Sequence, residues 1–296
     1  MADKLRFATV ARPGALTTFQ DSGRPGLAHL GVPRSGALDI KSYLLANRLV
    51  GNQAGTTVLE TTFDGVSLSF SSAVLVAVTG ALADVMVNGQ PVGWSMPIYV
   101  PEGAHLDVGA AKVGLRSYVA VAGGFQVAPV LGSRSRDLLS GLGPSPLVAN
   151  ELIAIGPGSS STPAIDFAPY LPLGDSLPLT VHPGPRRNWL TKKAEHDLFS
   201  QRYQVLPESN RIALRFKGSP IERHYHEELP SEAVVWGALE LLPTGEVIVF
   251  LADHPTTGGY PVVGVIDETS ASLCAQLRSG DQVHFARARS WRTSEG

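Results

Sequence analysis

Short apolar runs, separated by glycine and proline, dominate the chain. Residues 74–78, 118–122 and 262–266 are three examples, rich in valine and alanine, of the length of a strand, and bounded by turn residues. The 31 glycines and 22 prolines punctuate the sequence between such runs. The pattern predicts a mainly β protein with a few helices, organised as barrels or sandwiches.

Two dipeptides predict tight turns between strands. Asn88-Gly89 stands between two short apolar segments, which is a strong signal for a β-hairpin because both residues accept a positive φ. Thr244-Gly245 precedes the apolar run that starts at Val247 and predicts a second turn of this kind.

Three segments predict helices. Residues 40–50 place their apolar side chains near one face, with Asp39 as the expected N-cap and Gly51 as the expected residue after the C-terminus. Residues 187–199 and 270–277 predict a second and a shorter third helix.

The segment 156–176 is rich in glycine, serine and proline and predicts a boundary between two domains. We expect residues 1–170 to form one subdomain and residues 171–296 a second, with segments that interleave between them. The phrases Val-Ala-Arg-Pro-Gly at 10–14 and Val-His-Pro-Gly at 181–184 hint weakly at duplication, but no fixed repeat period is present.

Composition narrows the classes of partner. The 296 residues include 44% hydrophobic and 17% charged residues and carry a formal net charge of -2. No Lys/Arg-rich tract is present, so we expect no nucleic-acid binding. No apolar span of about 20 residues suggests a membrane helix, and we expect a cytoplasmic protein. The single cysteine, Cys274, is expected to be a core residue.

The densest polar cluster follows the apolar run 246–252. It combines an acid, a histidine, two hydroxyls, two adjacent glycines and a tyrosine: Asp253, His254, Thr256, Thr257, Gly258, Gly259 and Tyr260. Adjacent glycines can present backbone N–H groups to an anion, and the acid and histidine can move a proton. A tight turn that needs glycine for its geometry is the equally weighted alternative.

A second polar cluster lies in the irregular segment 17–39. Asp21, Arg24, Ser35 and Asp39 are expected to contact a polar ligand, with Arg24 receiving a carboxylate. The alternative is an internal Asp21–Arg24 pair that fixes the shape of the loop.

Other sequence signals exclude some chemistry. His224 and His226 share a face on a strand but lack an evident third ligand, so we expect no metal site. The sequence contains no G-x-x-x-x-G-K-[ST] or G-x-G-x-x-G phosphate loop, no G-x-S-x-G elbow and no Met-Lys biotin-attachment pair.

Several long motifs carry a resemblance to a known family. They are Pro13-Gly14, Thr17 to Gly26 (TTFQDSGRPG), Gly31 to Asp39 (GVPRSGALD), Ala46 to Asn52 (ANRLVGN), Leu59-Glu60, Pro183 to Arg186 (PGPR), Ser209, Arg211, Ser231, Gly237, Asp253, Thr256 to Pro261 (TTGGYP) and Ala275 to Leu277 (AQL). Together they closely resemble the biotin-dependent carboxyltransferase family, which includes allophanate hydrolase subunit 2, the C subunit of 5-oxoprolinase and KipA-like proteins.

The resemblance implies two cyclophilin-like β-barrel subdomains and an obligate partner, subunit 1 (KipI-like, or the B subunit of 5-oxoprolinase), in a heteromer. It implies a subunit of an ATP-dependent hydrolase of small amides, with 5-oxoproline opened to glutamate as the expected reaction. An allophanate hydrolase or urea carboxyltransferase subunit is one alternative, and a KipA-like regulatory subunit without catalysis is another. We expect ATP to act at the level of the complex, and biotin to enter only on another protein.

On this basis we assign candidate roles. The candidate catalytic residues are Asp253, Thr256, Thr257, Gly258 and Gly259. The candidate substrate-binding residues are Gln20, Asp21, Arg24, Ser35, Asp39, Asn47, Arg211 and Tyr260. Three positions depart from the family pattern: Asn210 replaces the usual Asp, Glu240 replaces a frequent Gln, and Leu242 replaces a frequent Pro.

Overall fold

The computed structural model describes residues 5–158, 167–168 and 176–293. Most of the Gly/Pro-rich segment that predicts the domain boundary lies outside these residues. The chain divides into two compact units: Met1–Arg24, Ser35–Asp137 and Gly141–Pro172 form the first, and Pro25–Arg34, Leu138–Ser140 and Leu173–Gly296 form the second. Two short segments of the first half of the sequence therefore group with the second half.

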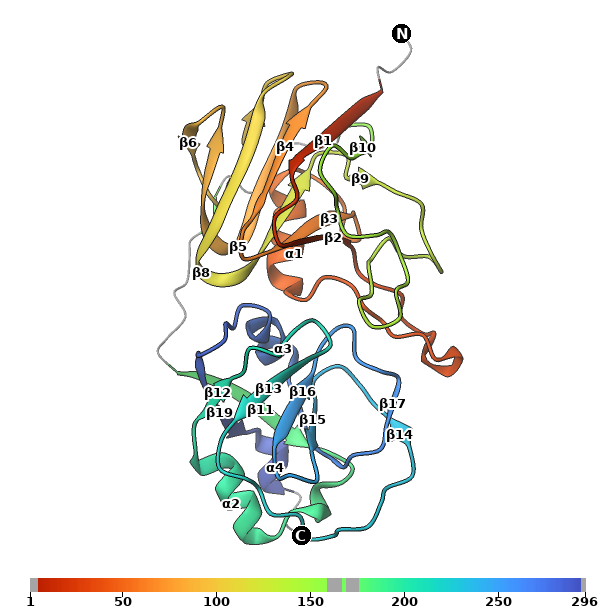
Figure 1. The fold of residues 1–296 in the computed structure, drawn as a ribbon, viewed down its shortest axis with the longest axis vertical. Coiled ribbons are helices and arrows are strands. Elements are labelled where there is room, and N and C mark those ends of the chain that lie inside the picture. Colours follow the sequence, from red (N-terminus) through yellow and green to blue (C-terminus); the bar gives the residue numbers. More distant parts are fainter. Residues whose placement is uncertain (1–4, 159–166, 169–175, 294–296) are drawn as a thin grey trace. The chain divides into compact units, whose positions relative to one another are not determined.

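Among its described residues, the first unit contains a ten-stranded sheet and one α-helix (Figure 1). Its elements are β1 (Arg6–Arg12), β2 (Leu16–Gln20), α1 (Ile40–Leu49), β3 (Val58–Thr62), β4 (Val66–Phe70), β5 (Val74–Val87), β6 (Gln90–Val92), β7 (Ile98–Val100), β8 (His105–Val121), β9 (Phe125–Gln126) and β10 (Leu152–Ile155). The main path of the sheet runs β2-β3-β8-β4-β1-β10-β9, and β5 pairs with β8, β6 and β7.

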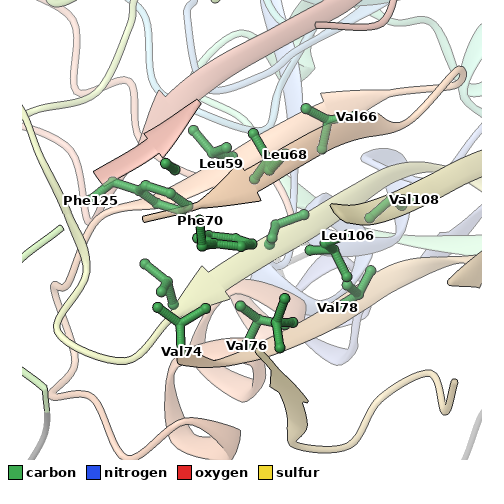
Figure 2. Packing of buried hydrophobic residues seen from close by; sticks show 14 of the residues in the cluster. Leu59, Val66, Leu68, Phe70, Val74, Val76, Val78, Leu106, Val108 and Phe125 are labelled. Carbon is green, nitrogen blue, oxygen red and sulfur yellow. The ribbon is translucent and has the colours of Figure 1, made fainter. Parts of the chain in front are cut away.

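The two long strands β5 and β8 curve the sheet around a valine-rich core. Their register shifts three times between Gly80 and Val85, and such bulges bend and twist a pair of strands. Figure 2 shows side chains of this core, among them Val76 and Val78 from β5 and Leu106 and Val108 from β8, which are fully buried. The apolar runs 74–78 and 118–122, which predicted strands, lie within β5 and at the end of β8.

The second unit contains a closed seven-stranded barrel in the order β11-β18-β15-β16-β13-β12-β19 (Figure 1). Its elements are a 3₁₀ turn (Ala28–Leu30), β11 (Leu177–Pro183), a 3₁₀ turn (Arg187–Trp189), α2 (Lys192–Ser200), β12 (Tyr203–Val205), β13 (Ala213–Lys217), β14 (Glu232–Ala233), β15 (Ala238–Leu241), β16 (Val247–Phe250), β17 (Thr257–Gly258), β18 (Val262–Ile266), α3 (Glu268–Cys274), β19 (Gln282–Arg287) and α4 (Arg289–Thr293). Strands β14 and β17 form a separate two-stranded ribbon. The prediction of a mainly β chain with two barrel subdomains is confirmed.

Local signals predicted helix α1 and two turns correctly. Helix α1 begins after Asp39, whose carboxylate accepts the Ser42 N–H (3.1 Å), and ends before Gly51, which has a φ of 71°. Asn88 and Gly89 both have a positive φ at the β5–β6 turn, as predicted. Gly245 likewise has a positive φ before β16.

Two helix predictions need correction. The segment predicted as one helix over 187–199 is a 3₁₀ turn followed by α2, because Leu190 is extended and the Thr191 hydroxyl caps a new helix start at Lys192. Helix α3 begins at Glu268, earlier than predicted, because Asp267 accepts the Ser270 N–H (2.7 Å) and caps the N-terminus. Within the described residues, no helix is both long and apolar enough to cross a membrane.

Candidate functional site

Asp21, at the end of β2, holds together the loop of residues 133–135 in the first unit. One carboxylate oxygen, Oδ1, accepts hydrogen bonds from the hydroxyls of Ser133 and Ser135 (2.6 Å each) and from the Gly23 N–H (2.8 Å). The other oxygen, Oδ2, accepts the Arg134 N–H (2.6 Å). A buried carboxylate with four donors is well satisfied, which makes Asp21 a structural anchor for this loop.

Three further candidates bind the same stretch of backbone. The Arg24 guanidinium donates from Nη2 to the Ser135 carbonyl (2.6 Å) and is buried, so this fork of donors is turned toward the protein. The Gln20 amide and the Ser35 hydroxyl both donate to the Arg136 carbonyl (3.0 and 3.1 Å). These contacts hold the Arg24 side chain against the loop of residues 130–136, and its binding of a ligand carboxylate stays a prediction.

The remaining candidates of the first unit support helix α1. Asp39 caps it, and its backbone N–H donates to the Tyr118 hydroxyl (2.7 Å), which in turn donates to Glu60 (2.8 Å). Asn47 donates to the Thr56 carbonyl and accepts from the Asn52 amide (2.9 Å each), which fixes the turn after the helix. All of these side chains are buried and contribute to the local structure, and their contact with a substrate stays a prediction.

In the second unit, Asp253 and Arg211 form a buried bidentate ion pair. Arg211 donates from Nε to Oδ2 (2.9 Å) and from Nη2 to Oδ1 (3.0 Å) of Asp253, and the two side chains are 1% and 0% exposed. The Leu138 N–H also donates to Oδ2 (3.0 Å). Asp253 is thus engaged as an acceptor and Arg211 as its counter-ion, and neither faces solvent.

The departure at Asn210 leaves this arrangement intact. Its side-chain oxygen accepts the backbone N–H groups of Ile212 (2.7 Å) and Ala213 (3.3 Å), which forms a local turn before β13. An aspartate would accept the same two bonds. The acid that serves Arg211 is Asp253, not residue 210.

The segment 256–260 forms the accessible part of the cluster. Thr257, Gly259 and Tyr260 are exposed, whereas Thr256 and Gly258 are half-buried. Thr257 and Gly258 form β17, which pairs with β14, and an ion pair between Arg186 and Glu232 of β14 flanks the ribbon. Neither Gly258 nor Gly259 has a positive φ, so a left-handed backbone is not the reason for glycine at these two positions.

Gly258 is required for another reason, which is a close approach to Glu240. A Cβ atom at residue 258 would lie 2.7 Å from Oε1 of Glu240 and 3.0 Å from a methyl group of Val234. At Gly259 the nearest atom is the Leu229 carbonyl oxygen at 3.7 Å, which is an ordinary contact. Gly258 therefore closes directly over the Glu240 carboxyl group, while Gly259 has room for a side chain.

Glu240 is an acidic residue beside this segment to which the sequence analysis assigned no role. It lies on β15, directly between Ile248 of β16 and Val262 of β18, and is 1% exposed. Within the part of the chain that the structure describes, its buried Oε1 has no hydrogen-bond partner. Burial raises the pKa of Glu240 to about 7. The sequence carried two signals: an acid inside an otherwise apolar strand, and a departure from the glutamine that is frequent at this position in the family.

The other ionisable candidates are accounted for. His254 is buried and its Nδ1 donates to the Pro255 carbonyl (2.7 Å). Cys274 is buried, as predicted, and burial raises the pKa of its thiol, which disfavours a nucleophilic thiolate. No group of three or more His, Cys, Asp or Glu side chains among the described residues is arranged to hold a metal ion.

One protein-family model matches most of the chain. The model of the carboxyltransferase domain, subdomain A and B, matches residues 30–287. The chain belongs to the carboxyltransferase family. This confirms the resemblance that the sequence motifs indicated.

Two curated relatives show the range of proteins that contain this domain. The chain is 32% identical to the C subunit of 5-oxoprolinase from Escherichia coli over 94% of this chain and 90% of that protein. It is 31% identical to urea amidolyase of Lachancea kluyveri over 93% of this chain but 16% of that protein. The domain thus occurs both as nearly a whole subunit and as a small part of a large protein.

Solved structures agree with the fold. The urea amidolyase of K. lactis superposes with a TM-score of 0.89 at 27% identity over 97% of this chain and 19% of that chain. The protein TTHA0988 superposes with a TM-score of 0.85 at 32% identity over 96% of this chain. This chain spans 56% of the length of TTHA0988.

Proposed function

We propose that this chain is the C subunit of a multi-subunit, ATP-dependent 5-oxoprolinase, which opens the lactam of 5-oxoproline to glutamate. The observation that carries the proposal is the 32% identity to the C subunit of the Escherichia coli 5-oxoprolinase across 94% of this chain and 90% of that protein. The corresponding protein of Haemophilus influenzae supports it, at 29% identity over 90% of this chain.

A urea-type function is the second candidate. Urea amidolyase relatives match at 31% and 28% identity, and the fold of one protein of that name superposes closely. These matches cover 16% of each sequence, so the activity named for them involves much that this chain does not contain. They support an alternative role as an allophanate hydrolase subunit 2 or a urea carboxyltransferase-type subunit.

The exposed residues of the 256–260 segment suit the proposed chemistry. A lactam carbonyl is a poor electrophile, and attack on it is accelerated by donors placed where negative charge develops on oxygen. We assign this task to the hydroxyls of Thr256 and Thr257, with backbone N–H groups of Gly258 and Gly259 beside them. Tyr260, which is 43% exposed, contributes a hydroxyl at the same surface.

The buried candidates serve the site indirectly. Asp253 begins the segment that leads into β17 and forms an ion pair with Arg211. The Asp253 N–H also donates to the Arg211 carbonyl (3.1 Å). We therefore place Asp253 and Arg211 in support of the loop rather than in contact with substrate. The bonds of Gln20, Asp21, Arg24, Ser35, Asp39 and Asn47 give them the same kind of role in the first unit.

The proposal includes partners and a location. We expect subunit 1, the B-type or KipI-like protein of 5-oxoprolinase, to form a heteromer with this chain in the cytoplasm. ATP would be consumed by the complex, since the sequence of this chain contains no phosphate-loop motif. Biotin, if a urea-type reaction applied, would be carried by another protein.

Reconstitution tests the function most directly. The chain is co-expressed with its expected partner subunits, and ATP hydrolysis and amide cleavage are measured with 5-oxoproline, allophanate and urea in parallel. Glutamate formed from 5-oxoproline supports the proposal. Activity confined to allophanate or urea favours the second candidate. Tight assembly without turnover of any of the three favours a KipA-like regulatory subunit.

A pair of variants then tests the role of the segment. Thr257→Val removes an exposed hydroxyl of β17, and loss of one donor to a developing oxyanion lowers kcat by about 100-fold. Thr244→Val, at the β15–β16 turn, removes an exposed hydroxyl elsewhere on the second unit and is the matched control. Equal kcat values for the two assembled variants would remove the segment from the reaction.

A further inference from the structure

The Glu240 carboxyl group lies in the middle of an apolar face. On β15 it shares a side with Ala238, since side chains two residues apart point the same way along a strand, and Leu242, just after the strand, packs against the same cluster. Ile248 and Val262 are its direct neighbours across the two ladders. The buried hydrophobic residues that cluster on this side are Val234, Ala238, Ile248, Phe250 and Val262.

Among the described residues, the charged groups on the surrounding elements do not pair with Glu240. On β14, Glu232 is bound by Arg186. On β13, Arg215 lies in register with Ile248 but is exposed, and His254 beyond β16 is bonded to Pro255. Strands β16, β17 and β18 carry no ionisable side chain. A carboxylate in these surroundings is unfavourable, so the neutral acid is the form that fits the closed structure.

Gly258 of the ribbon that carries the proposed site packs against the Glu240 carboxyl group. Oε1 lies 2.7 Å from the position that a Cβ of residue 258 would take, and the half-buried Gly258 is flanked in sequence by the exposed residues Thr257 and Gly259. An ionised Glu240 gains solvation only if water enters at this point or if β17 moves away. Either change displaces the backbone that presents Thr257.

We propose that Glu240 is a positioning residue of the candidate site: its neutral carboxyl keeps β17 seated, and loss of its proton to water displaces β17 and weakens activity. The inference about activity rests on the proposed function. The inference about the seating of β17 does not, because it concerns the folded chain alone.

Hydrogen exchange tests the seating without any substrate. In the full chain, amide exchange of peptides that cover residues 255–261 is measured by mass spectrometry from about pH 6 to about pH 8 and corrected for the intrinsic exchange rate. We expect protection in the wild type to fall by at least about threefold across this range. Glu240→Gln, which keeps the shape but has no proton to lose, should show constant protection.

Glu246→Gln is the matched control, because Glu246 is an exposed acid at the turn that joins β15 to β16. It should retain the fall in protection of the wild type. Constant protection in the wild type, or the same fall in Glu240→Gln, would overturn the proposal.

The pH profile of the reconstituted complex supplies the second readout. We expect the wild type and Glu246→Gln to lose activity above about pH 7, and Glu240→Gln to show no such decline. The ratio of activity at about pH 8 to activity at about pH 6 should therefore be at least about fivefold higher in Glu240→Gln than in the wild type. An unchanged ratio in Glu240→Gln contradicts the proposal. If no substrate is turned over while exchange behaves as expected, the proposed function fails and the seating of β17 by Glu240 stands.

Discussion

Asp21 in the first unit and Glu240 in the second are both buried acids beside a glycine-containing loop, but their surroundings are opposite. Asp21 accepts four hydrogen bonds from its own loop and from residues 133–135. Glu240 is enclosed by valine, isoleucine and the backbone of Gly258, and its Oε1 lacks a partner in the described part of the chain. The comparison separates an acid that stabilises a loop from an acid that the fold retains at a cost in stability.

The Arg211–Asp253 pair extends the comparison to an acid with a full charge partner. Arg211→Ala leaves the Asp253 carboxylate buried and uncompensated, and we expect the free energy of unfolding to fall by about 4 kcal/mol. Urea unfolding monitored by circular dichroism measures the loss. Arg215→Ala, which removes an exposed arginine from the neighbouring strand, is the control and should change it by less than about 0.5 kcal/mol. A similar small change in Arg211→Ala would contradict the buried pair.

The loop anchored by Asp21 should show the next largest effect. Asp21→Asn keeps the size of the side chain but removes its charge and places an amide NH₂ against hydrogen-bond donors. We expect a loss of about 3 kcal/mol in the free energy of unfolding. The exposed Asp64 offers the control Asp64→Asn. If both variants unfold at the same urea concentration, the Asp21 network does not stabilise the unit.

Glu240 should behave in the opposite sense, and its effect depends on pH. Burial raises the pKa of Glu240 from an ordinary value of 4.5 to about 7, so between these values the native state holds a proton that the unfolded chain has lost. The wild type therefore loses stability as pH rises through this range, and the loss is complete above about pH 7.

Glu240→Gln has no such dependence. With partial solvent screening taken into account, we expect the stability of the variant relative to the wild type to increase by about 2 kcal/mol between about pH 4.5 and about pH 8. Urea unfolding at the two pH values measures this difference. A constant offset between the two proteins would show that Glu240 does not titrate in this way.

The contrast between Gly258 and Gly259 gives the smallest effect. Gly258→Ala forces a methyl group against Glu240 and Val234 and should cost about 1.5 kcal/mol. Gly259→Ala meets no such contact and should cost less than about 0.5 kcal/mol. Part of the cost of Gly258→Ala should disappear in a Glu240→Ala background, because the opposing carboxyl is then absent. Strict additivity of the two changes would argue against their contact.

The sequence predicted features that depend on a few neighbouring residues, and it did not predict features that depend on contacts between distant residues. The cap at Asp39 and the turn at Asn88-Gly89 act within a few residues and were correctly predicted. Three of the four donors to Asp21 lie 112 to 114 residues away, and Arg211 lies 42 residues before Asp253. No spacing rule reveals such pairings, so the sequence did not predict these structural contacts, and the ligand-binding roles of the same residues stay predictions.

The burial of Glu240 was also not predictable from the sequence. Its position in an apolar strand was visible, but its burial follows from pairing with β16 and β18 and from the covering ribbon, which depend on distant segments. The role of Gly258 was likewise hidden, because a glycine required for a close approach cannot be told from a glycine required for a positive φ by sequence alone.

We expect the Glu240 carboxyl group, which packs against Gly258 of β17, to keep its proton up to about pH 7. The contrast between Glu240 and Asp21 depends on this protonation. Carbon-13 NMR of the chain labelled at the glutamate side-chain carboxyl carbon, compared with Glu240→Gln for assignment, measures it directly. We predict one carboxyl resonance, absent from the variant, that titrates with a midpoint of about 7. A Glu240 resonance that titrates below about pH 5, in the ordinary range of glutamate, would contradict this prediction.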